Sequence, residues 1–182
     1  MIQDFIIPFV AVGLAELGDK TQLAVLCLAS KTKNYLQLIL GVMLAFILTD
    51  GLAIVLGDYL ASLIPLSYIR MISGSVFILF GIITLLRNNR EGAKCELKNP
   101  FLSGFGIVFV AELGDKTQIA SALFATRFNP VLVFFGVIAA LFILSMIAVF
   151  LGRYVYGRVD KKKVSMIAGT LFILIGAYCL FF

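Results

Sequence analysis

Long apolar stretches separated by short polar segments run along the whole chain. A helix needs about 20 apolar residues to cross a bilayer, and six stretches are near that length. They cover residues 5–29, 36–57, 65–86, 101–125, 130–151 and 164–182. Four prolines fall at or just before the start of a stretch, where a missing amide hydrogen costs a helix least: Pro8, Pro65, Pro100 and Pro130. The pattern predicts an all-α integral membrane protein, with six transmembrane helices in a single membrane domain of residues 1–182.

Two of these stretches are interrupted by the same polar sequence. Residues 15–22 read Ala-Glu-Leu-Gly-Asp-Lys-Thr-Gln, and residues 111–118 repeat all eight. Further matches follow at a nearly constant spacing: Gly41 with Gly136, Gly74 with Gly169, Phe77 with Phe172, and Gly81 with Gly176. The chain is therefore predicted to be an internal duplication, with repeat 1 in residues 1–86, a central loop in residues 87–100 and repeat 2 in residues 101–182.

Each repeat contains three predicted spans, and three is an odd number. The second repeat must therefore enter the membrane from the side opposite to the first. The two repeats are then related by a pseudo-two-fold axis in the membrane plane. Such inverted repeats, with an ion site near the midplane between them, are a recurring design of secondary transporters.

The composition agrees with a membrane protein and orients it. The chain has 182 residues, of which 62% are hydrophobic and 14% charged, more apolar than a soluble domain requires. Its net charge of +5 comes from the loops: eleven of the fifteen basic residues fall on one side of the predicted membrane and two on the other. Because the side rich in Lys and Arg faces the cytoplasm, we expect a cytoplasmic central loop and both termini outside. The bilayer is then the expected partner, and no nucleic acid is needed to explain the charge.

Each copy of the octapeptide places charged side chains inside an apolar stretch. Ionisable residues within a membrane are costly and mark functional sites by default. The candidate cation-binding acids are Glu16, Asp19, Glu112 and Asp115. On a continuous helix the two acids of one copy lie three residues apart and share a face, which Gln22 or Gln118 extends. In inverted repeats these two faces can meet near the middle of the bilayer.

The glycine between the two acids of each copy has two interpretations. Gly18 and Gly114 weaken a helix, so the backbone can unwind there and free carbonyl oxygens as ligands. They can equally allow close packing between helices, which is common in membranes. The sequence leaves both interpretations open.

The side chains available as ligands are hard oxygen donors. The four carboxylates are joined by Gln22, Gln118 and the hydroxyls of Thr21 and Thr117. Oxygen donors suit Ca²⁺, Mn²⁺ or Mg²⁺. The chain has no histidine, and its three cysteines lack CxxC spacing, so neither a zinc site nor a disulfide framework is expected.

The charges of the two octapeptides suggest that a divalent cation is exchanged for protons. Lys20 and Lys116 balance two of the four carboxylates, which leaves two net negative charges that one divalent cation or two protons would neutralise. We therefore expect proton-coupled antiport of a divalent cation. A plainer alternative is that Glu16 and Lys20, four residues apart on a helix, merely neutralise each other. That alternative leaves Asp19 and Asp115 unexplained.

One further acid, Asp50, lies inside the second span. It has no acidic counterpart, because Ser145 occupies the matching position of repeat 2. The sequence allows a fifth ligand, a residue of the proton path, an ion partner of a motif lysine, or a polar residue that reaches water near the end of its span.

The pattern Glu-x-Gly-Asp-Lys-Thr, once in each half, resembles the signature of a known transporter family. This family contains the eukaryotic Golgi calcium/manganese transporter and small bacterial manganese exporters, and belongs to the lysine-exporter superfamily. The resemblance covers essentially the whole chain and implies cation/proton exchange that exports Mn²⁺, preferred here over Ca²⁺, from the cytosol. It also implies that the four motif acids bind the cation. Because the longer N-terminal and central segments of eukaryotic members are missing, we expect a multi-pass protein of a bacterial plasma membrane.

Other functions compete with this interpretation. The superfamily suggests an exporter of a cationic amino acid such as lysine, and a non-transporting membrane assembly factor is a third class. An intramembrane aspartyl protease needs Gly-x-Gly-Asp, whereas this chain has Glu-Leu-Gly-Asp, so no enzyme is expected. We expect no prosthetic group, with Mn²⁺ or Ca²⁺ and protons as transported substrates. A homo-oligomer is compatible with the sequence.

Overall fold

The computed structural model describes residues 2–86, 99–151 and 161–181. All regular structure in these ranges is helical. The elements are α1 (Ile2–Glu16), α2 (Lys20–Lys31), α3 (Tyr35–Leu63), α4 (Leu66–Leu86), α5 (Pro100–Glu112), α6 (Lys116–Ala125), α7 (Pro130–Met146), the π-helix η1 (Ile147–Leu151) and α9 (Lys161–Phe181). The predicted central loop falls almost wholly outside the described residues.

The first and fourth predicted spans are each broken into two helices. α1 gives way to α2 and α5 to α6, and both breaks fall inside the octapeptide. Gly18 has φ of +80° and Gly114 has φ of +75°, and no other described residue has a positive φ. Residues with a side chain avoid this left-handed region. An added Cβ at Gly114 would meet nothing within 4 Å, so backbone conformation, not close packing, explains this glycine.

Local signals account for several helix starts. Pro100 and Pro130 occupy the first turn of α5 and α7. Before each of them an asparagine caps the helix: the side chain of Asn99 accepts from the Leu102 amide, and that of Asn129 from the amides of Val131 and Leu132. The expectation for Pro8 was wrong, because α1 already begins at Ile2 and Pro8 lies inside it.

Two described helices are long and apolar enough to cross a membrane. They are Tyr35–Leu63 and Pro130–Phe150. The helices of the broken spans are individually too short for this criterion, because each covers only half of a predicted span. On its outward side α3 exposes Leu36, Leu52 and Val55, among other large apolar side chains.

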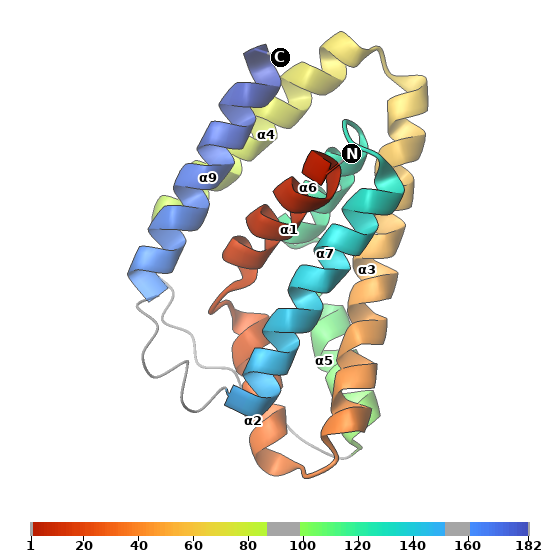
Figure 1. The fold of residues 1–182 in the computed structure, drawn as a ribbon, viewed down its shortest axis with the longest axis vertical. Coiled ribbons are helices and arrows are strands. Elements are labelled where there is room, and N and C mark those ends of the chain that lie inside the picture. The colour runs from red at the N-terminus through yellow and green to blue at the C-terminus, as the bar shows by residue number, and fades with distance from the viewer. Residues whose placement is uncertain (1, 87–98, 152–160, 182) are drawn as a thin grey trace.

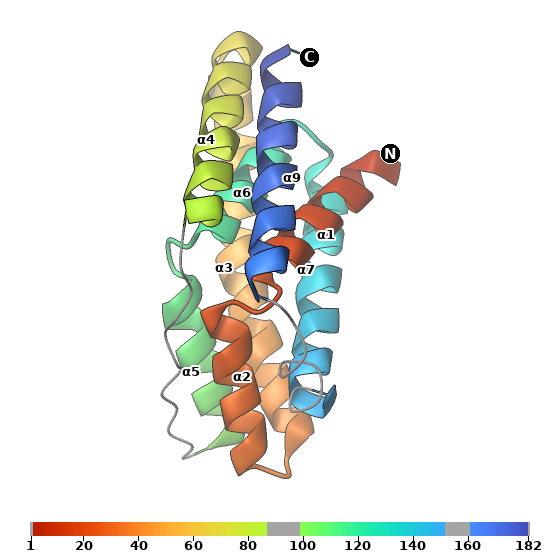
Figure 2. The ribbon, with the colours of Figure 1, turned by 90° about the vertical axis from the view of Figure 1, so that its left-hand side faces the viewer.

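The packing of helices is reciprocal between the two halves. α3 packs on α5, and α7, the sequence counterpart of α3, packs on α1. In the same way α2 packs on α5, and α6 packs on α1. The helices α4 and α9, which are counterparts of each other, form a pair and lie side by side in both ribbon views (Figures 1 and 2). The main helix contacts are therefore made between the two halves.

Matching glycines permit the closest approaches. A Cβ on Gly41 would collide with the carbonyl oxygen of Phe101, and a Cβ on Gly136 with that of Phe5. Gly136 is the counterpart of Gly41, and Phe5 is the counterpart of Phe101. The reciprocity thus extends from helices to single backbone contacts.

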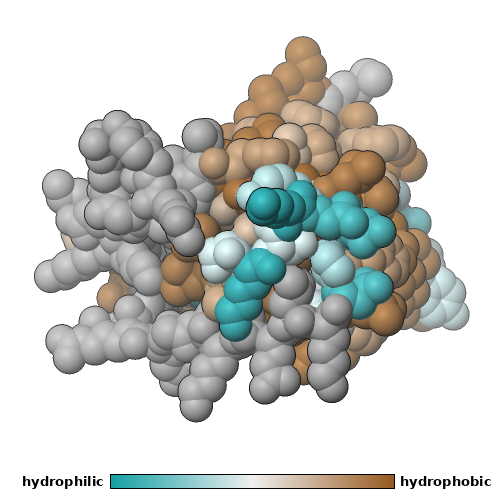
Figure 3. Space-filling model, turned by 90° about the horizontal axis from the view of Figure 1, so that it is seen from below, coloured by the Kyte–Doolittle hydropathy of each residue, from teal (hydrophilic) through white to brown (hydrophobic). Residues whose placement is uncertain are grey.

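The two ends of the bundle differ. Both termini lie toward one end, opposite the turn between α2 and α3 (Figure 1). Seen from the end with this turn, a hydrophilic patch lies beside largely hydrophobic flanks (Figure 3). Exposed residues of the turn include Ser30, Lys31, Lys33 and Asn34. Cys27 in α2 is disulfide-bonded, which the cysteine pattern did not predict.

Candidate cation site

The two helix breaks place equivalent acids at equivalent positions. Glu16 and Glu112 are the last residues of α1 and α5, while Asp19 and Asp115 are the N-caps of α2 and α6. The amide of each aspartate donates to the carbonyl of the preceding glutamate, over 3.1 Å in the first break and 3.0 Å in the second. A helix N-terminus carries a partial positive charge, which stabilises an acid there. Each break is therefore a turn that holds two carboxylates close together.

Three of the four predicted acids converge. Carboxylate oxygens of Glu16, Asp19 and Asp115 lie within 4.8 Å of one another. We call these three residues the acid cluster. Glu16 is fully buried and Asp19 is 7% exposed. The predicted convergence of acids from the two halves is therefore found. The predicted shared helix face is wrong, because the backbone leaves the helix between Glu16 and Asp19.

Glu112 is buried beside the cluster and is held by threonines. Its Oε1 accepts a hydrogen bond of 2.6 Å from the Thr21 hydroxyl, and its Oε2 one of 3.5 Å from Thr117. One threonine comes from each copy of the octapeptide. The two predicted supporting threonines thus contact the fourth acid rather than the acid cluster.

The motif lysines pair across the two halves. The ammonium of Lys116 contacts Asp19, lies 3.5 Å from Glu16 Oε1, and lies 3.6 Å from Asp115. Lys20 reaches Asp115 at 3.7 Å. The alternative in which Glu16 is neutralised by Lys20 within one helix is wrong, because the helix break separates them and the cation beside Glu16 is Lys116.

Two oxygens of the acid cluster have no hydrogen-bond partner among the described residues. They are Oε2 of Glu16 and Oδ2 of Asp115, and both atoms are buried. A buried carboxylate oxygen without a hydrogen bond is costly, although Oδ2 of Asp115 has the Lys116 ammonium 3.6 Å away. These atoms could bind a cation without first giving up a hydrogen bond.

Gln118 stabilises the second break instead of facing the cluster. Its Oε1 accepts from the Gly114 amide at 2.6 Å, and its Nε2 donates to the carbonyl of Thr49 at 3.1 Å. It thereby ties the break to α3. Its counterpart Gln22 is fully buried in α2.

Asp50 lies in the interior of the bundle. It is 1% exposed, and its Oδ1 accepts a hydrogen bond of 2.8 Å from the Ser121 hydroxyl. The alternative in which Asp50 reaches water is therefore wrong. It lies close enough to Glu16 to interact with it electrostatically, so a fifth ligand or a proton-path residue stays open.

Ser121 is a residue that the sequence analysis missed. A signal was present: Asp50 and Ser121 both depart from the duplication, since their counterparts are Ser145 and Val25. A carboxylate found only in repeat 1 and a hydroxyl found only in repeat 2 were a clue to a buried pair. The same comparison also singles out Thr49, whose counterpart is Leu144, although it is the main-chain carbonyl of Thr49 that binds Gln118.

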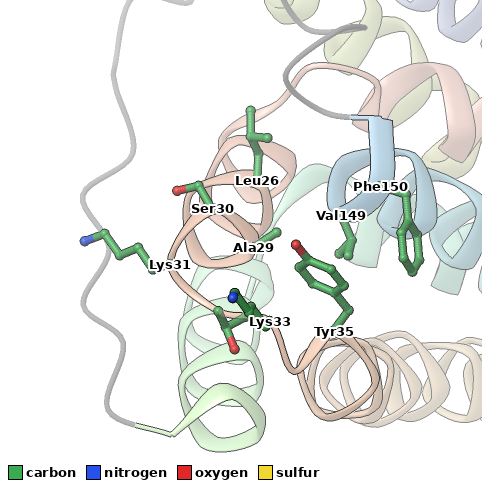
Figure 4. Close-up of a pocket in the computed structure, with 9 residues that line it drawn as sticks. Leu26, Ala29, Ser30, Lys31, Lys33, Tyr35, Val149 and Phe150 are labelled. Carbon is green, nitrogen blue, oxygen red and sulfur yellow. The ribbon is translucent and has the colours of Figure 1, made fainter.

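A cavity of about 460 Å³ lies beside the turn between α2 and α3 (Figure 4). It is bounded by α2, the turn into α3 and η1, and none of the motif acids lines it. Its lining consists of Leu26, Ala29, Ser30, Lys31, Thr32, Lys33, Tyr35, Val149 and Phe150. This cavity is separate from the acid cluster.

Known proteins resemble this chain over both of its halves. A family model described as "Divalent cation/proton antiporter GDT1" matches residues 4–92 and 100–182. A Vibrio cholerae protein named "Putative manganese exporter" is 27% identical over 179 residues, which cover 97% of this chain and 90% of that protein. The "GDT1-like protein sll0615" of Synechocystis is 28% identical over 197 residues, covering 96% of this chain and 95% of that protein. No solved structure gives a significant match.

Proposed function

The chain belongs to the GDT1 family of divalent cation/proton antiporters, and from this premise we propose that it exports Mn²⁺ from a bacterial cytosol in exchange for protons. Ca²⁺ is the alternative cargo, since both ions accept carboxylate and carbonyl oxygens. The protein would act in the plasma membrane, with residues 87–100 cytoplasmic and both termini outside. The name of the Vibrio cholerae relative favours Mn²⁺ over Ca²⁺.

The proposal includes six membrane crossings arranged as two inverted repeats, residues 1–86 and 101–182. The reciprocal packing of α3 on α5 and of α7 on α1 supports this arrangement. So does the position of both termini toward one end of the bundle (Figure 1). In this arrangement α1 with α2, and α5 with α6, each cross as a pair of half-helices. Broken helices are tolerated at membrane depth where the irregular backbone is buried in protein or lines a cavity.

One observation carries the proposed site. The acid cluster joins Glu16 and Asp19 of one repeat to Asp115 of the other, with carboxylate oxygens within 4.8 Å. A group of buried carboxylates in a membrane protein needs cations to be stable. We assign Glu16, Asp19, Glu112 and Asp115 as cation-binding acids, with Glu112 brought in by movement or by water. Asp50 is a further candidate for the proton path.

The charges of the site are consistent with exchange. The four acids and the two motif lysines leave two negative charges, which one Mn²⁺ or two protons would neutralise. Binding of the metal and binding of protons are then alternatives at one site. This is the condition that couples the two flows.

The lysine-exporter alternative fits less well. A cationic amino acid brings its own carboxylate, which needs a basic partner in the site. Lys116 is already paired with all three acids of the cluster, and Lys20 with Asp115. Among the described side chains of the site, no basic group is left for such a substrate.

Transport by the purified protein in liposomes tests the proposal. Mn²⁺ and Ca²⁺ are supplied separately under an imposed pH gradient, and metal flux and lumenal pH are recorded together. We expect Mn²⁺ uptake driven by the gradient, with protons moving in the opposite direction. Metal flux without a pH change would exclude the coupling.

A pair of variants separates a transporter from an assembly factor. The Glu16→Gln and Asp115→Asn proteins should lose Mn²⁺ flux in liposomes and lose manganese tolerance in cells at unchanged protein levels. An assembly factor would tolerate both changes. Asp4→Asn, outside the octapeptide, is the matched acid-to-amide control.

A further inference from the structure

Lys116 occupies the position in which a cation would contact all three acids of the cluster. Its ammonium contacts Asp19 and lies 3.5 Å from Glu16 and 3.6 Å from Asp115. The side chain is only 15% exposed. These are the same three carboxylates whose oxygens lie within 4.8 Å of one another.

The matching lysine of the first repeat is placed differently. Lys20 has the same position in its octapeptide, yet its side chain is 42% exposed and, among the described residues, it forms an ion pair only with Asp115, at 3.7 Å. Two residues of identical sequence context therefore adopt an inner and an outer position. The outer position shows that a motif lysine fits at the rim of the site without losing contact with an acid.

A divalent cation and the Lys116 ammonium cannot share the cluster. A metal bound to these carboxylates has to lie about 2.0–2.6 Å from their oxygens. The ammonium already lies within hydrogen-bond or ion-pair distance of all three carboxylates. Two cations at such a separation repel strongly where water is scarce.

We propose that Lys116 is a tethered counter-cation that competes with the transported metal for the acid cluster. Its ammonium offsets one of the three negative charges of the cluster when no metal is bound, and swings to a rim position like that of Lys20 when the metal enters. The lysine keeps its proton throughout, so only a side-chain movement is required. The inference rests on the proposed function and deepens it, because it assigns a residue that sets the metal affinity of that site.

Competition by Lys116 lowers the affinity of the site for the metal and speeds release of the metal. A lysine that returns to the cluster helps to displace the metal, so its removal should tighten binding and slow turnover. A lysine with a purely structural role would do neither. The distinction between affinity and turnover is therefore the readout.

The test compares Lys116→Gln with Lys20→Gln. Mn²⁺ binding to the purified proteins is measured by calorimetry, and turnover is measured in liposomes. We expect Lys116→Gln to bind Mn²⁺ roughly tenfold more tightly or better, the effect of removing one competing charge worth about 1.4 kcal/mol, and to turn over more slowly. Lys20→Gln should change affinity much less. Equal or weaker Mn²⁺ binding by a folded Lys116→Gln protein would overturn the inference.

A second measurement needs no variant and covers the case in which Lys116→Gln fails to fold. Lysine side chains of the native protein are labelled with an amine-reactive reagent, with and without Mn²⁺, and quantified by mass spectrometry. Mn²⁺ should increase the labelling of Lys116 severalfold and leave that of Lys20 nearly unchanged. Unchanged or decreased labelling of Lys116 at saturating Mn²⁺ would overturn the inference.

Different results would remove the inference and the proposed function. If the native protein binds and transports Mn²⁺ but Lys116 behaves as a structural residue, only the inference is lost. If the native protein neither binds nor transports Mn²⁺ or Ca²⁺, the proposed function is lost, and the inference with it.

Discussion

Single side chains at the site differ in their partners, and the differences assign them distinct tasks. The three acids of the cluster share one ammonium, that of Lys116. Glu112 instead accepts hydrogen bonds from two threonines, so its orientation is fixed by neutral donors. We infer that the threonines orient Glu112 from outside the cluster.

The two threonines should not be equivalent. Thr21 donates to Glu112 at 2.6 Å, whereas Thr117 donates at 3.5 Å, near the limit for a hydrogen bond. Removing a group that orients a metal ligand typically costs roughly 10–100-fold in metal affinity. We expect Thr21→Val to weaken Mn²⁺ binding within that range and Thr117→Val to weaken it much less, as measured by calorimetry. Equal effects of the two changes would contradict this assignment.

Gly114 provides a test of the backbone at the break. It has φ of +75° and open space around it, so an added methyl group would strain the backbone without a clash. A residue with a Cβ pays roughly 1–2 kcal/mol in the left-handed region. We expect Gly114→Ala to lower the thermal midpoint and the Mn²⁺ affinity together.

Gly106 in α5 is the matched control for that change. An added Cβ there also meets nothing within 4 Å, and its φ is not positive. Gly106→Ala should therefore leave both quantities unchanged or raise the thermal midpoint slightly, because alanine favours helix. A similar loss in both proteins would show that strain at the break is not the cause.

At the scale of helices, each break places one acid at the end of a helix and another at the start of the next, which a continuous helix cannot do. α1 and α5 end at a glutamate, and α2 and α6 begin at an aspartate cap. The long helices α3 and α7 hold these half-helices in place through glycine contacts. α7 continues into the π-helix η1, whereas its counterpart α3 stays α-helical throughout. π-helical turns often occur at functional sites, and here one borders the cavity.

The α4–α9 pair depends on glycines at its contact. A Cβ on Gly81 would lie 2.6 Å from the carbonyl oxygen of Gly169, and one on Gly176 would lie 2.7 Å from that of Gly74. Overpacking of this kind costs roughly 1–3 kcal/mol or more. We expect Gly81→Ala and Gly176→Ala to lower the thermal midpoint in detergent by similar amounts, because the two positions are counterparts.

Gly51 is the control for the helix pair. A Cβ at Gly51 would meet only a side-chain atom of Phe134, at an ordinary 3.5 Å. Gly51→Ala should therefore be nearly neutral in the same assay. A small effect at Gly81 and Gly176 would mean that α4 and α9 do not approach as closely as described.

Much of the helical arrangement could be predicted from the duplicated sequence, but the pairing of charges could not. The octapeptide located both interruptions but left open whether the helix breaks there. The number of spans between its two copies suggested that their acids would converge. The sequence could not show that Lys116 replaces Lys20 as the partner of Glu16, because spacing along one helix says nothing about contacts across a break. Nor could it place Asp50 in the interior, since burial depends on the neighbouring α6.

For the whole molecule, the halves match in sequence but differ in one part of their packing: α6 packs extensively on α3, whereas its counterpart α2 barely contacts α7. A Cβ on Gly57 of α3 would collide with the carbonyl oxygen of Ala122 in α6, so these helices are closely packed. The counterpart of Ala122 is Leu26 in α2, which lines the cavity of about 460 Å³. The bundle is thus closed near α6 and open near α2. A transporter of inverted repeats would reverse this asymmetry when it changes the side that it faces.

Cysteine accessibility tests the asymmetry. Leu26→Cys and Ala122→Cys are made in a variant without the three native cysteines that still transports Mn²⁺. A water-soluble thiol reagent should label Cys at position 26 from the cytoplasmic side much faster than Cys at position 122 from either side. Comparable labelling of the two positions would contradict a bundle that is open near α2 and closed near α6. Labelling of position 26 from outside only would contradict the proposed orientation in the membrane.

The proposed cation site is shared by acids of both repeats, and the location of bound Mn²⁺ tests this most directly. A crystal structure with Mn²⁺, with the ion identified by its anomalous scattering, would give the position. We predict a single strong peak within coordination distance of Glu16 or Asp19 and also of Asp115 or Glu112. A peak bound by the acids of one repeat alone, or one far from both octapeptides, would contradict the account.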